Sequence, residues 1–126
     1  MARILVVDDD PQVRKLLVSF LERDGHMITT AANGLEARRW LDGLKMDLII
    51  TDIVMPEADG FELIGWMRNL PDHPRIIAIS GGSSALDKGY LLTVAQHLAA
   101  DKVLPKPVSY ETMKLAVHEV LACANA

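Results

Sequence analysis

The sequence predicts an α/β fold in which one parallel, five-stranded sheet is sandwiched between helices. Two observations carry this prediction. Short apolar runs recur five times along the 126 residues, and segments with the apolar spacing of a helix follow them. Strands that alternate with helices are joined by right-handed crossovers, which make the strands parallel and put the helices on the faces of the sheet.

The predicted strands lie at residues 4–7, 27–30, 48–51, 76–79 and 103–104. The first, third and fourth are continuously apolar rather than alternating, which is typical of strands that are covered on both faces. We therefore place these three strands in the middle of the sheet. Five strand–helix units favour the flavodoxin-like (βα)5 arrangement, a three-layer sandwich with the strand order 2-1-3-4-5.

The first predicted helix has clear signals at both of its ends. Pro11 stands where a first helical residue is favoured, and Gly25 stands where a left-handed cap is favoured. Between them, apolar residues recur at the spacing i, i+3, i+4, i+7 and i+8, namely Val13, Leu16, Leu17, Phe20 and Leu21.

The later helices are marked by cap residues and by apolar stripes. Asn33 is expected to cap the second helix, Asp59 the third and Ser109 the fifth. Their apolar residues are Leu35, Trp40, Leu41 and Leu44 in the second, Phe61, Ile64 and Met67 in the third, Leu86, Tyr90, Val94 and Leu98 in the fourth, and Met113, Val117, Val120 and Leu121 in the fifth.

Length and composition favour a single soluble domain over residues 1–126. The net charge is −4 and the sequence pI is about 5.5, so binding to nucleic acid or to an anionic membrane is not expected. Cys123 is the only cysteine, which excludes an internal disulfide and fits the cytoplasm. No apolar run approaches the roughly 18 residues that span a bilayer. We expect a cytoplasmic protein whose partners are proteins.

Polar residues that follow the strands carry the predicted chemistry. In the order 2-1-3-4-5, ligands bind beyond the carboxyl ends of the strands, at the point where strands 1 and 3 are neighbours. The polar residues at these ends are Asp8, Asp9 and Asp10 after the first strand, Asp52 after the third, Ser80 after the fourth and Lys106 after the fifth.

The acidic residues at these ends predict a divalent metal site. Asp8 and Asp9 should face Asp52 closely, and three neighbouring carboxylates repel one another. A divalent cation resolves this repulsion. Oxygen ligands that leave places for water suit Mg²⁺, or Mn²⁺ in its stead, better than Zn²⁺.

The same strand ends are suited to phosphoryl transfer. Ser80 offers a hydroxyl donor, and Lys106 offers a compact positive charge for oxygens that gain charge in the reaction. Asp52, central and next to the metal, is then the nucleophile, because carboxylates serve as covalent acceptors of phosphoryl groups. Hydrolysis of the resulting acyl phosphate would reset the protein.

Four short motifs follow predicted strands. They are ILVVDDDP at 4–11, TDIVMP at 51–56 with Asp59-Gly60, ISG at 79–81, and LPKP at 104–107. In this order, and over nearly the whole chain, they resemble the receiver domain of bacterial two-component response regulators. The resemblance implies a signalling phosphoacceptor that catalyses its own phosphorylation and slow dephosphorylation, not an enzyme with a separate substrate.

The resemblance implies a metal-binding role for four residues. Asp52 would be the phosphoacceptor and a metal ligand. Asp9 would bind Mg²⁺ directly and Asp8 largely through water, while Val54 would contribute its backbone carbonyl.

Further residues would contact the phosphoryl group. The Ser80 hydroxyl, the Gly81 backbone amide and the Lys106 ammonium would bind its oxygens, and the resemblance implies a cis peptide bond between Lys106 and Pro107. The donor would be a phosphohistidine of a sensor histidine kinase or of a histidine phosphotransfer protein. An output protein or effector domain would read the face formed by helix 4, strand 5 and helix 5, and this face is also compatible with a homodimer.

One position departs from the family pattern and bears on the output. Val103 stands where receivers usually carry Tyr or Phe, three residues before the lysine, so an aromatic rotamer cannot couple to Ser80 here. We therefore expect phosphorylation to reorder residues 81–98 and to reshape the surface around Tyr90, with Pro107 also at the output side.

Three alternative functions stay open at this point. A degenerate receiver would bind partners without being phosphorylated, and Val103 is compatible with that. A phosphohydrolase with an aspartate nucleophile would share Mg²⁺, Asp and Lys, but the chain lacks a second aspartate two residues after Asp52. A flavodoxin-type FMN carrier would need a hydroxyl-rich phosphate loop where this chain has three acids.

Overall fold

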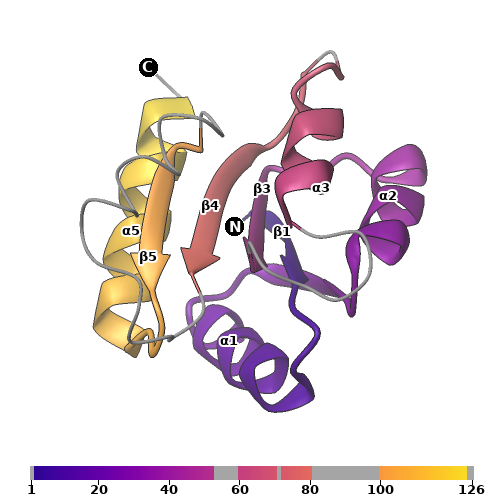
Figure 1. Ribbon diagram of the computed structural model, residues 1–126. Coiled ribbons are helices and arrows are strands. Elements are labelled where there is room, and N and C mark those ends of the chain that lie inside the picture. Colours follow the sequence, from indigo (N-terminus) through magenta and orange to yellow (C-terminus); the bar gives the residue numbers. More distant parts are fainter. Residues whose placement is uncertain (1, 53–59, 71, 81–99, 125–126) are drawn as a thin grey trace.

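A parallel five-stranded sheet forms the centre of the molecule (Figure 1). The computed structural model describes residues 2–52, 60–70, 72–80 and 100–124. Within these residues the strand order is β2-β1-β3-β4-β5, so the fold class and the strand order expected from the sequence are confirmed. The strands are β1 (Arg3–Val7), β2 (Met27–Ala31), β3 (Leu48–Asp52), β4 (Arg75–Ser80) and β5 (Lys102–Pro105).

Helices cover both faces of the sheet. They are α1 (Pro11–Arg23), α2 (Gly34–Gly43), α3 (Gly60–Met67) and α5 (Tyr110–Ala124). The helices α1 and α5 pack on one face, while α2 and α3 pack on the other (Figure 1). The fourth helix expected at residues 86–98 lies outside the described residues.

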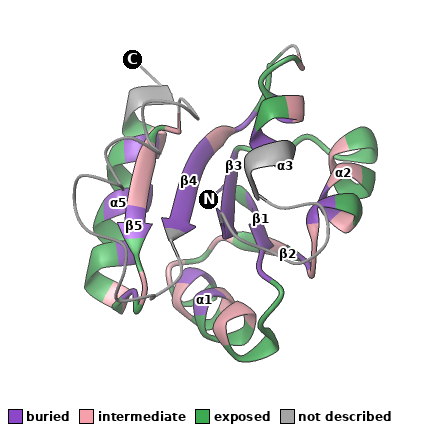
Figure 2. Ribbon diagram, viewed as in Figure 1, coloured by how far each residue is buried: buried purple, intermediate pink, exposed green. Residues whose placement is uncertain are grey.

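Each central strand contributes to both layers of the core, because successive side chains of a strand point to opposite faces. In β1, Ile4 and Val6 pack toward α1 and α5, whereas Leu5 and Val7 pack toward α2 and α3. All four are buried, as is the whole of β3 (Figure 2). The continuously apolar strands therefore lie in the middle of the sheet, as expected.

The helix caps follow the sequence signals. The Asp10 carboxylate accepts a hydrogen bond from the backbone N–H of Gln12 at 2.9 Å and caps α1 one residue before Pro11. Gly25 follows α1 with φ of 85°, the left-handed conformation expected there. Asn33 caps α2 and Ser109 caps α5 through their side-chain oxygens. The expected cap Asp59 lies outside the described residues.

The register of the strands brings their carboxyl ends to one edge of the sheet. Val7 lies opposite Thr51, so the residues after β1 meet the end of β3. On the other side of β3, Asp52 lies opposite Ile79. The polar residues that lie far apart in the sequence are therefore neighbours at the carboxyl edge of the sheet.

The described helices are too short or too polar for a bilayer. Within the residues that the structure describes, none of them could cross a membrane.

Candidate functional site

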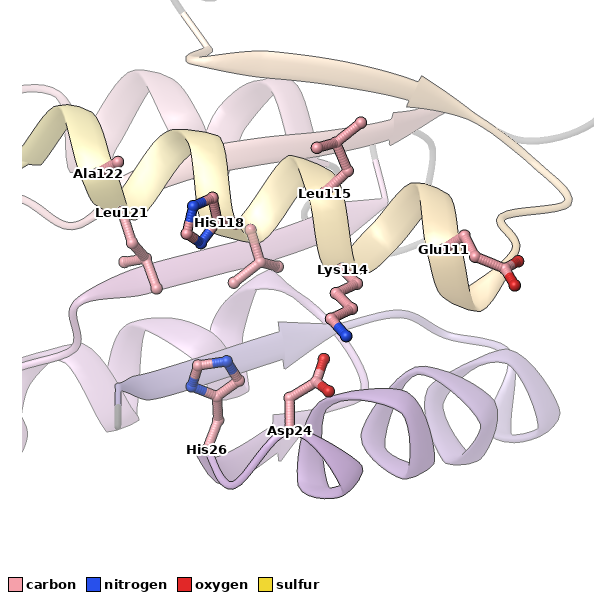
Figure 3. Close-up of a pocket in the computed structure, with 9 residues that line it drawn as sticks. Asp24, His26, Glu111, Lys114, Leu115, His118, Leu121 and Ala122 are labelled. Carbon is pink, nitrogen blue, oxygen red and sulfur yellow. The ribbon is translucent and has the colours of Figure 1, made fainter.

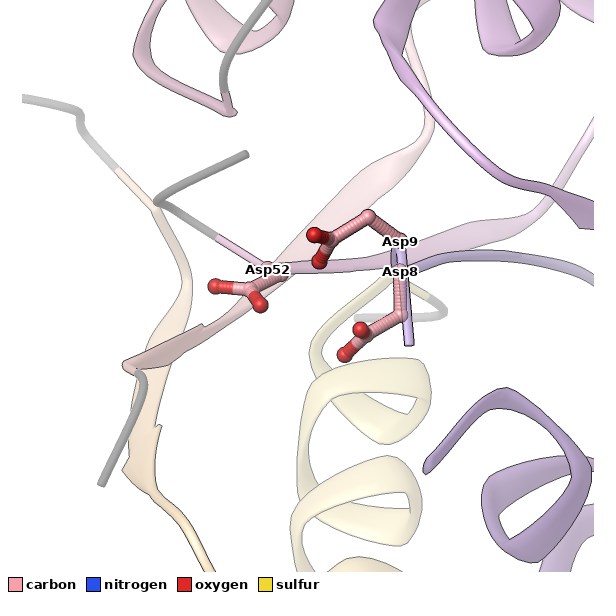
Figure 4. A group of neighbouring side chains, drawn as sticks. All are labelled: Asp8, Asp9 and Asp52. Carbon is pink, nitrogen blue, oxygen red and sulfur yellow. The ribbon is translucent and has the colours of Figure 1, made fainter. Parts of the chain in front are cut away.

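Three aspartates gather at the carboxyl edge of the sheet (Figure 4). Asp8 and Asp9 directly follow β1, and Asp52 is the last residue of β3. One carboxylate oxygen of each lies within 4.8 Å of the other two. Asp8 and Asp52 are buried, whereas Asp9 is exposed, so the cluster opens to solvent on one side. The proximity expected from the strand order is present.

Backbone and side-chain hydrogen bonds fix Asp8 in the turn between β1 and α1. Its N–H donates to the carbonyl of Ala31 at 3.1 Å, and its Oδ1 accepts from the N–H of Asp10 at 2.9 Å. Its carbonyl oxygen accepts from Nη1 of Arg14 at 2.7 Å. The other carboxylate oxygen, Oδ2, is buried and has no hydrogen bond of good geometry among the described residues.

Lys106 supplies the positive charge of this edge. Its Nζ donates to Oδ2 of Asp52 at 2.8 Å and lies 2.9 Å from Oδ2 of Asp8, an ion pair without hydrogen-bond geometry. The lysine follows β5, and its peptide bond to Pro107 is cis, as expected. Within the part of the chain that the structure describes, the ammonium is ion-paired with two of the three carboxylates and leaves the negative charge of this cluster in excess.

The two buried charges shift each other's proton affinity. Burial raises the pKa of Asp8 above its ordinary value, more than the Asp10 amide and the Lys106 charge lower it. Burial lowers the pKa of Lys106, but the hydrogen bond to Asp52 and the charges of Asp52 and Asp8 outweigh it and raise this pKa above its usual value. Lys106 therefore stays protonated at neutral pH.

The donor set fits a hard divalent cation. All three candidate side chains offer carboxylate oxygens, which Mg²⁺ prefers, and the exposed side at Asp9 leaves room for water. The buried Oδ2 of Asp8 accepts no hydrogen bond among the described residues and is ion-paired with Lys106, which a cation could replace. The residues at this edge therefore suit Mg²⁺ chemically.

Several expected site residues fall outside the described part of the chain. Val54, Gly81 and Tyr90 are among them. Ser80 ends β4, where it pairs with Pro105, and its side chain is not described.

Val103 lies on β5 and is half-buried. It packs against the core layer on the side of α2 and α3. No aromatic ring therefore stands at this position of β5.

Sequence reasoning missed Arg14. The sequence offers a weak signal for it, since a cation six residues after Asp8 falls at the end of the first turn of the first helix. Only the folded turn shows that its guanidinium reaches back to the Asp8 carbonyl.

Two recesses lie near α1. One, of about 330 Å³, shares Lys106 with the acidic cluster and is lined mainly by apolar side chains: Val13, Leu16, Leu17, Ile79, Lys106, Pro107 and Val108. Another, of about 740 Å³, lies between α5 and the turn after α1, where Lys114 points toward Asp24 and His118 faces His26 (Figure 3). The three site aspartates do not line the second recess.

The chain belongs to the response regulator receiver domain family, whose sequence model matches residues 4–118. Receiver domains act in two-component signalling, where they interact with histidine kinases and output effector domains and bind Mg²⁺ at an acidic pocket.

Known regulators and solved structures agree with this membership. Protein PetR of Rhodobacter capsulatus is 32% identical over 123 residues, which cover 94% of this chain and 48% of PetR. Transcriptional regulatory protein GltR of Pseudomonas aeruginosa is 34% identical over 97% of this chain and 50% of GltR. The chain thus spans about half the length of these two relatives. A two-component response regulator from Clostridium difficile has a TM-score of 0.87 at 28% identity, with 100% of both chains covered.

Proposed function

We propose that this receiver domain accepts a phosphoryl group on Asp52 in a Mg²⁺-dependent reaction. The donor is a phosphohistidine of a sensor histidine kinase or of a histidine phosphotransfer protein. One observation carries the proposal: the buried Asp52 carboxylate lies 2.8 Å from the Lys106 ammonium and within 4.8 Å of the carboxylates of Asp8 and Asp9. A nucleophile, a counter-charge and a cation-binding group are thus within reach of one phosphorus atom.

The transfer exchanges one bond at phosphorus for another. A carboxylate oxygen of Asp52 attacks the phosphorus, the P–N bond to the donor histidine breaks, and the imidazole nitrogen keeps the electron pair. The product is an acyl phosphate, which water later hydrolyses to restore Asp52. Bound Mg²⁺ would offset the charge of the carboxylates and of the phosphoryl oxygens.

The protein's own groups would position and stabilise the phosphoryl group. Lys106 would exchange its contact with Asp52 for one with a phosphoryl oxygen, which gains charge in the transfer. The Ser80 hydroxyl and the Gly81 amide are proposed as further donors to these oxygens. Asp9 and Asp8 would hold the cation, together with the carbonyl of Val54.

The recess beside Lys106 supports a protein as the phosphodonor. It is mainly apolar, and Leu16 on its rim is 49% exposed. A partner that brings its phosphohistidine to Asp52 would bury this surface, which a small phosphodonor would leave uncovered. We propose that the donor protein packs an apolar side chain against Leu16 and Pro107.

We also propose how the signal leaves the site. Val103 is half-buried and packs against the core layer of α2 and α3 without an aromatic ring. The signal would therefore run through Ser80 and residues 81–98 to the surface around Tyr90. An output protein or effector domain would read that surface together with β5 and α5. We place the reaction in the cytoplasm and treat residues 1–126 as one receiver domain.

Intact-mass measurement with acetyl phosphate and Mg²⁺ tests the phosphoacceptor. We expect a gain of one phosphoryl group that is lost with EDTA and in Asp52→Asn. The variant Asp42→Asn is the matched control, because Asp42 is exposed on α2, and it should be phosphorylated normally.

Two other results would contradict the proposal. The absence of an adduct with acetyl phosphate and with a phosphohistidine protein would instead favour a receiver that binds partners without phosphorylation. Rapid release of phosphate from a small metabolite would favour a phosphohydrolase.

A further inference from the structure

Arg14 holds the turn that presents two of the site aspartates. It lies near the start of α1, and its side chain is half-buried. Its Nη1 donates to the carbonyl oxygen of Asp8 at 2.7 Å, and its backbone N–H donates to the carbonyl of Asp10 at 3.0 Å. A guanidinium is always charged and makes short, strong hydrogen bonds. One residue therefore ties both ends of the turn to the helix.

The bond to the Asp8 carbonyl bears directly on Asp9. The carbonyl of Asp8 belongs to the peptide unit that continues to Asp9, and this unit is planar. Holding its oxygen fixes the orientation of the plane and hence the direction in which the Asp9 Cα and side chain leave it. The Asp9 side chain is exposed, so its place relative to Asp52 depends mainly on this backbone.

We propose that Arg14 is a positioning residue for the divalent cation site. It touches the backbone of Asp8 and acts on the cation only through the geometry of Asp8 and Asp9. The inference rests on the proposed Mg²⁺ site. Mutation of groups that orient the ligands of a metal typically costs about 10- to 100-fold in metal affinity.

The positive charge of Arg14, taken alone, would have the opposite effect on the affinity for Mg²⁺. Removal of a positive charge near three carboxylates strengthens the attraction of a cation to them. If Arg14 acted only through its charge, a neutral variant would bind Mg²⁺ more tightly. If Arg14 acts by holding the turn, the same variant binds Mg²⁺ more weakly.

Calorimetric titration of the full chain with Mg²⁺ separates the two effects. We expect Arg14→Met to bind Mg²⁺ about 10-fold more weakly than the wild type. Arg14→Lys keeps the charge and part of the reach, and it should lie between the two. Lys15→Met is the matched control, because Lys15 is the exposed neighbour on the same helix, and it should bind as tightly as the wild type or slightly more tightly.

Backbone amide chemical shifts of Asp8, Asp9 and Asp10 provide a second readout without phosphorylation. In Arg14→Met these shifts should change before Mg²⁺ is added, while shifts in β4 stay as in the wild type. If Arg14→Met does not fold, the comparison of Arg14→Lys with Lys15→Met still decides, and weaker binding by Arg14→Lys alone supports the proposal.

The outcomes distinguish this inference from the proposed function. Equal or tighter binding by Arg14→Met, with a wild type that binds Mg²⁺, would overturn the positioning role alone. A wild type that binds no Mg²⁺ would overturn both. A wild type that binds Mg²⁺ but takes no phosphoryl group would overturn the phosphoacceptor and leave Arg14 as the residue that positions the cation site.

Discussion

Lys106 is ion-paired with two carboxylates that a cation would also attract. Its Nζ lies 2.8 Å from Asp52 and 2.9 Å from Asp8, and its side chain is only 17% exposed. In such surroundings a lysine weakens cation binding through its charge and yet assists phosphoryl transfer. The two effects can be separated at this single residue.

We predict that Lys106→Met binds Mg²⁺ more tightly and is phosphorylated at least ~10-fold more slowly. Titration calorimetry measures the first quantity, and intact mass after mixing with acetyl phosphate measures the second. Lys102→Met, at the start of β5 where Lys102 pairs with Glu119, is the control and should change neither. Weaker Mg²⁺ binding by Lys106→Met would contradict this account of the site.

Asp8 is expected to destabilise the fold at neutral pH. Burial raises its folded pKa above the ordinary 3.8, so the folded chain binds a proton more readily than the unfolded chain. Stability therefore falls as pH rises from 3.8 through the folded pKa. In EDTA at pH 7, Asp8→Asn should increase the free energy of unfolding, because it removes a buried charge that the folded chain disfavours.

Urea unfolding at several pH values tests the Asp8 prediction. The difference between Asp8→Asn and the wild type should shrink toward pH 4, where the wild-type carboxyl takes up a proton. It should also shrink when Mg²⁺ is added, because the cation stabilises the wild-type cluster. The control Asp42→Asn should differ from the wild type by less than about 0.5 kcal/mol. If the free energy of unfolding of Asp8→Asn exceeded that of the wild type by the same amount at every pH, the role of the Asp8 charge would be contradicted.

At the level of elements, the turn after α1 depends on a backbone that only glycine adopts easily. Gly25 has φ of 85°, and a Cβ there would meet no atom within 4 Å. Gly25→Ala should thus cost about 1 kcal/mol through the backbone alone. Gly43 ends α2, also in open space but without a positive φ, so Gly43→Ala should be neutral or stabilise by up to about 1 kcal/mol. Equal changes in the midpoint of thermal unfolding for Gly25→Ala and Gly43→Ala would contradict this reasoning.

The elements and the place of the site could be predicted because they depend on local patterns. Runs such as 4–7 and 48–51 are too apolar to face water, so their central position follows from sequence. Asp52 ends β3 and Lys106 follows β5, and parallel strands end at the same edge. The sheet topology alone therefore predicts that these two residues lie close together.

Other features depend on contacts between distant residues and could not be predicted. Asp8 and Asp9 are adjacent and chemically identical, yet one is buried and the other exposed, because the turn after β1 directs them differently. Leu35 and Trp40 belong to the apolar stripe of α2, but both stay largely exposed, while Gly34 and Ala37 are buried. The Trp40 indole instead donates to the Thr30 carbonyl of β2.

At the scale of the whole molecule, two core layers share one sheet. Residues of β1 and β3 alternate between the layer under α1 and α5 and the layer under α2 and α3. The site aspartates lie at the ends of these same two strands. Both layers pack against these two strands. Loss of either layer should therefore disrupt the positions of the site aspartates relative to one another.

We predict that a cavity in either layer destabilises the whole domain in one step. Met113 of α5 and Met67 of α3 are each 0% exposed, and they lie in different layers. Met113→Ala and Met67→Ala should each lower the free energy of unfolding by about 2 to 5 kcal/mol. Leu115→Ala is the control on α5, where the side chain is 58% exposed, and it should change stability by about 0.5 kcal/mol or less.

Urea unfolding followed by both far-ultraviolet circular dichroism and tryptophan fluorescence tests the shared sheet. The two signals should coincide in each variant, because a small domain whose layers share their strands unfolds cooperatively. The stabilisation gained on adding Mg²⁺ should equal that of the wild type, since both methionines lie on helices and neither is one of the proposed cation ligands. Two separate transitions in Met67→Ala would show instead that the layer of α2 and α3 unfolds by itself, and the cation would then stabilise only the transition that exposes β1 and β3.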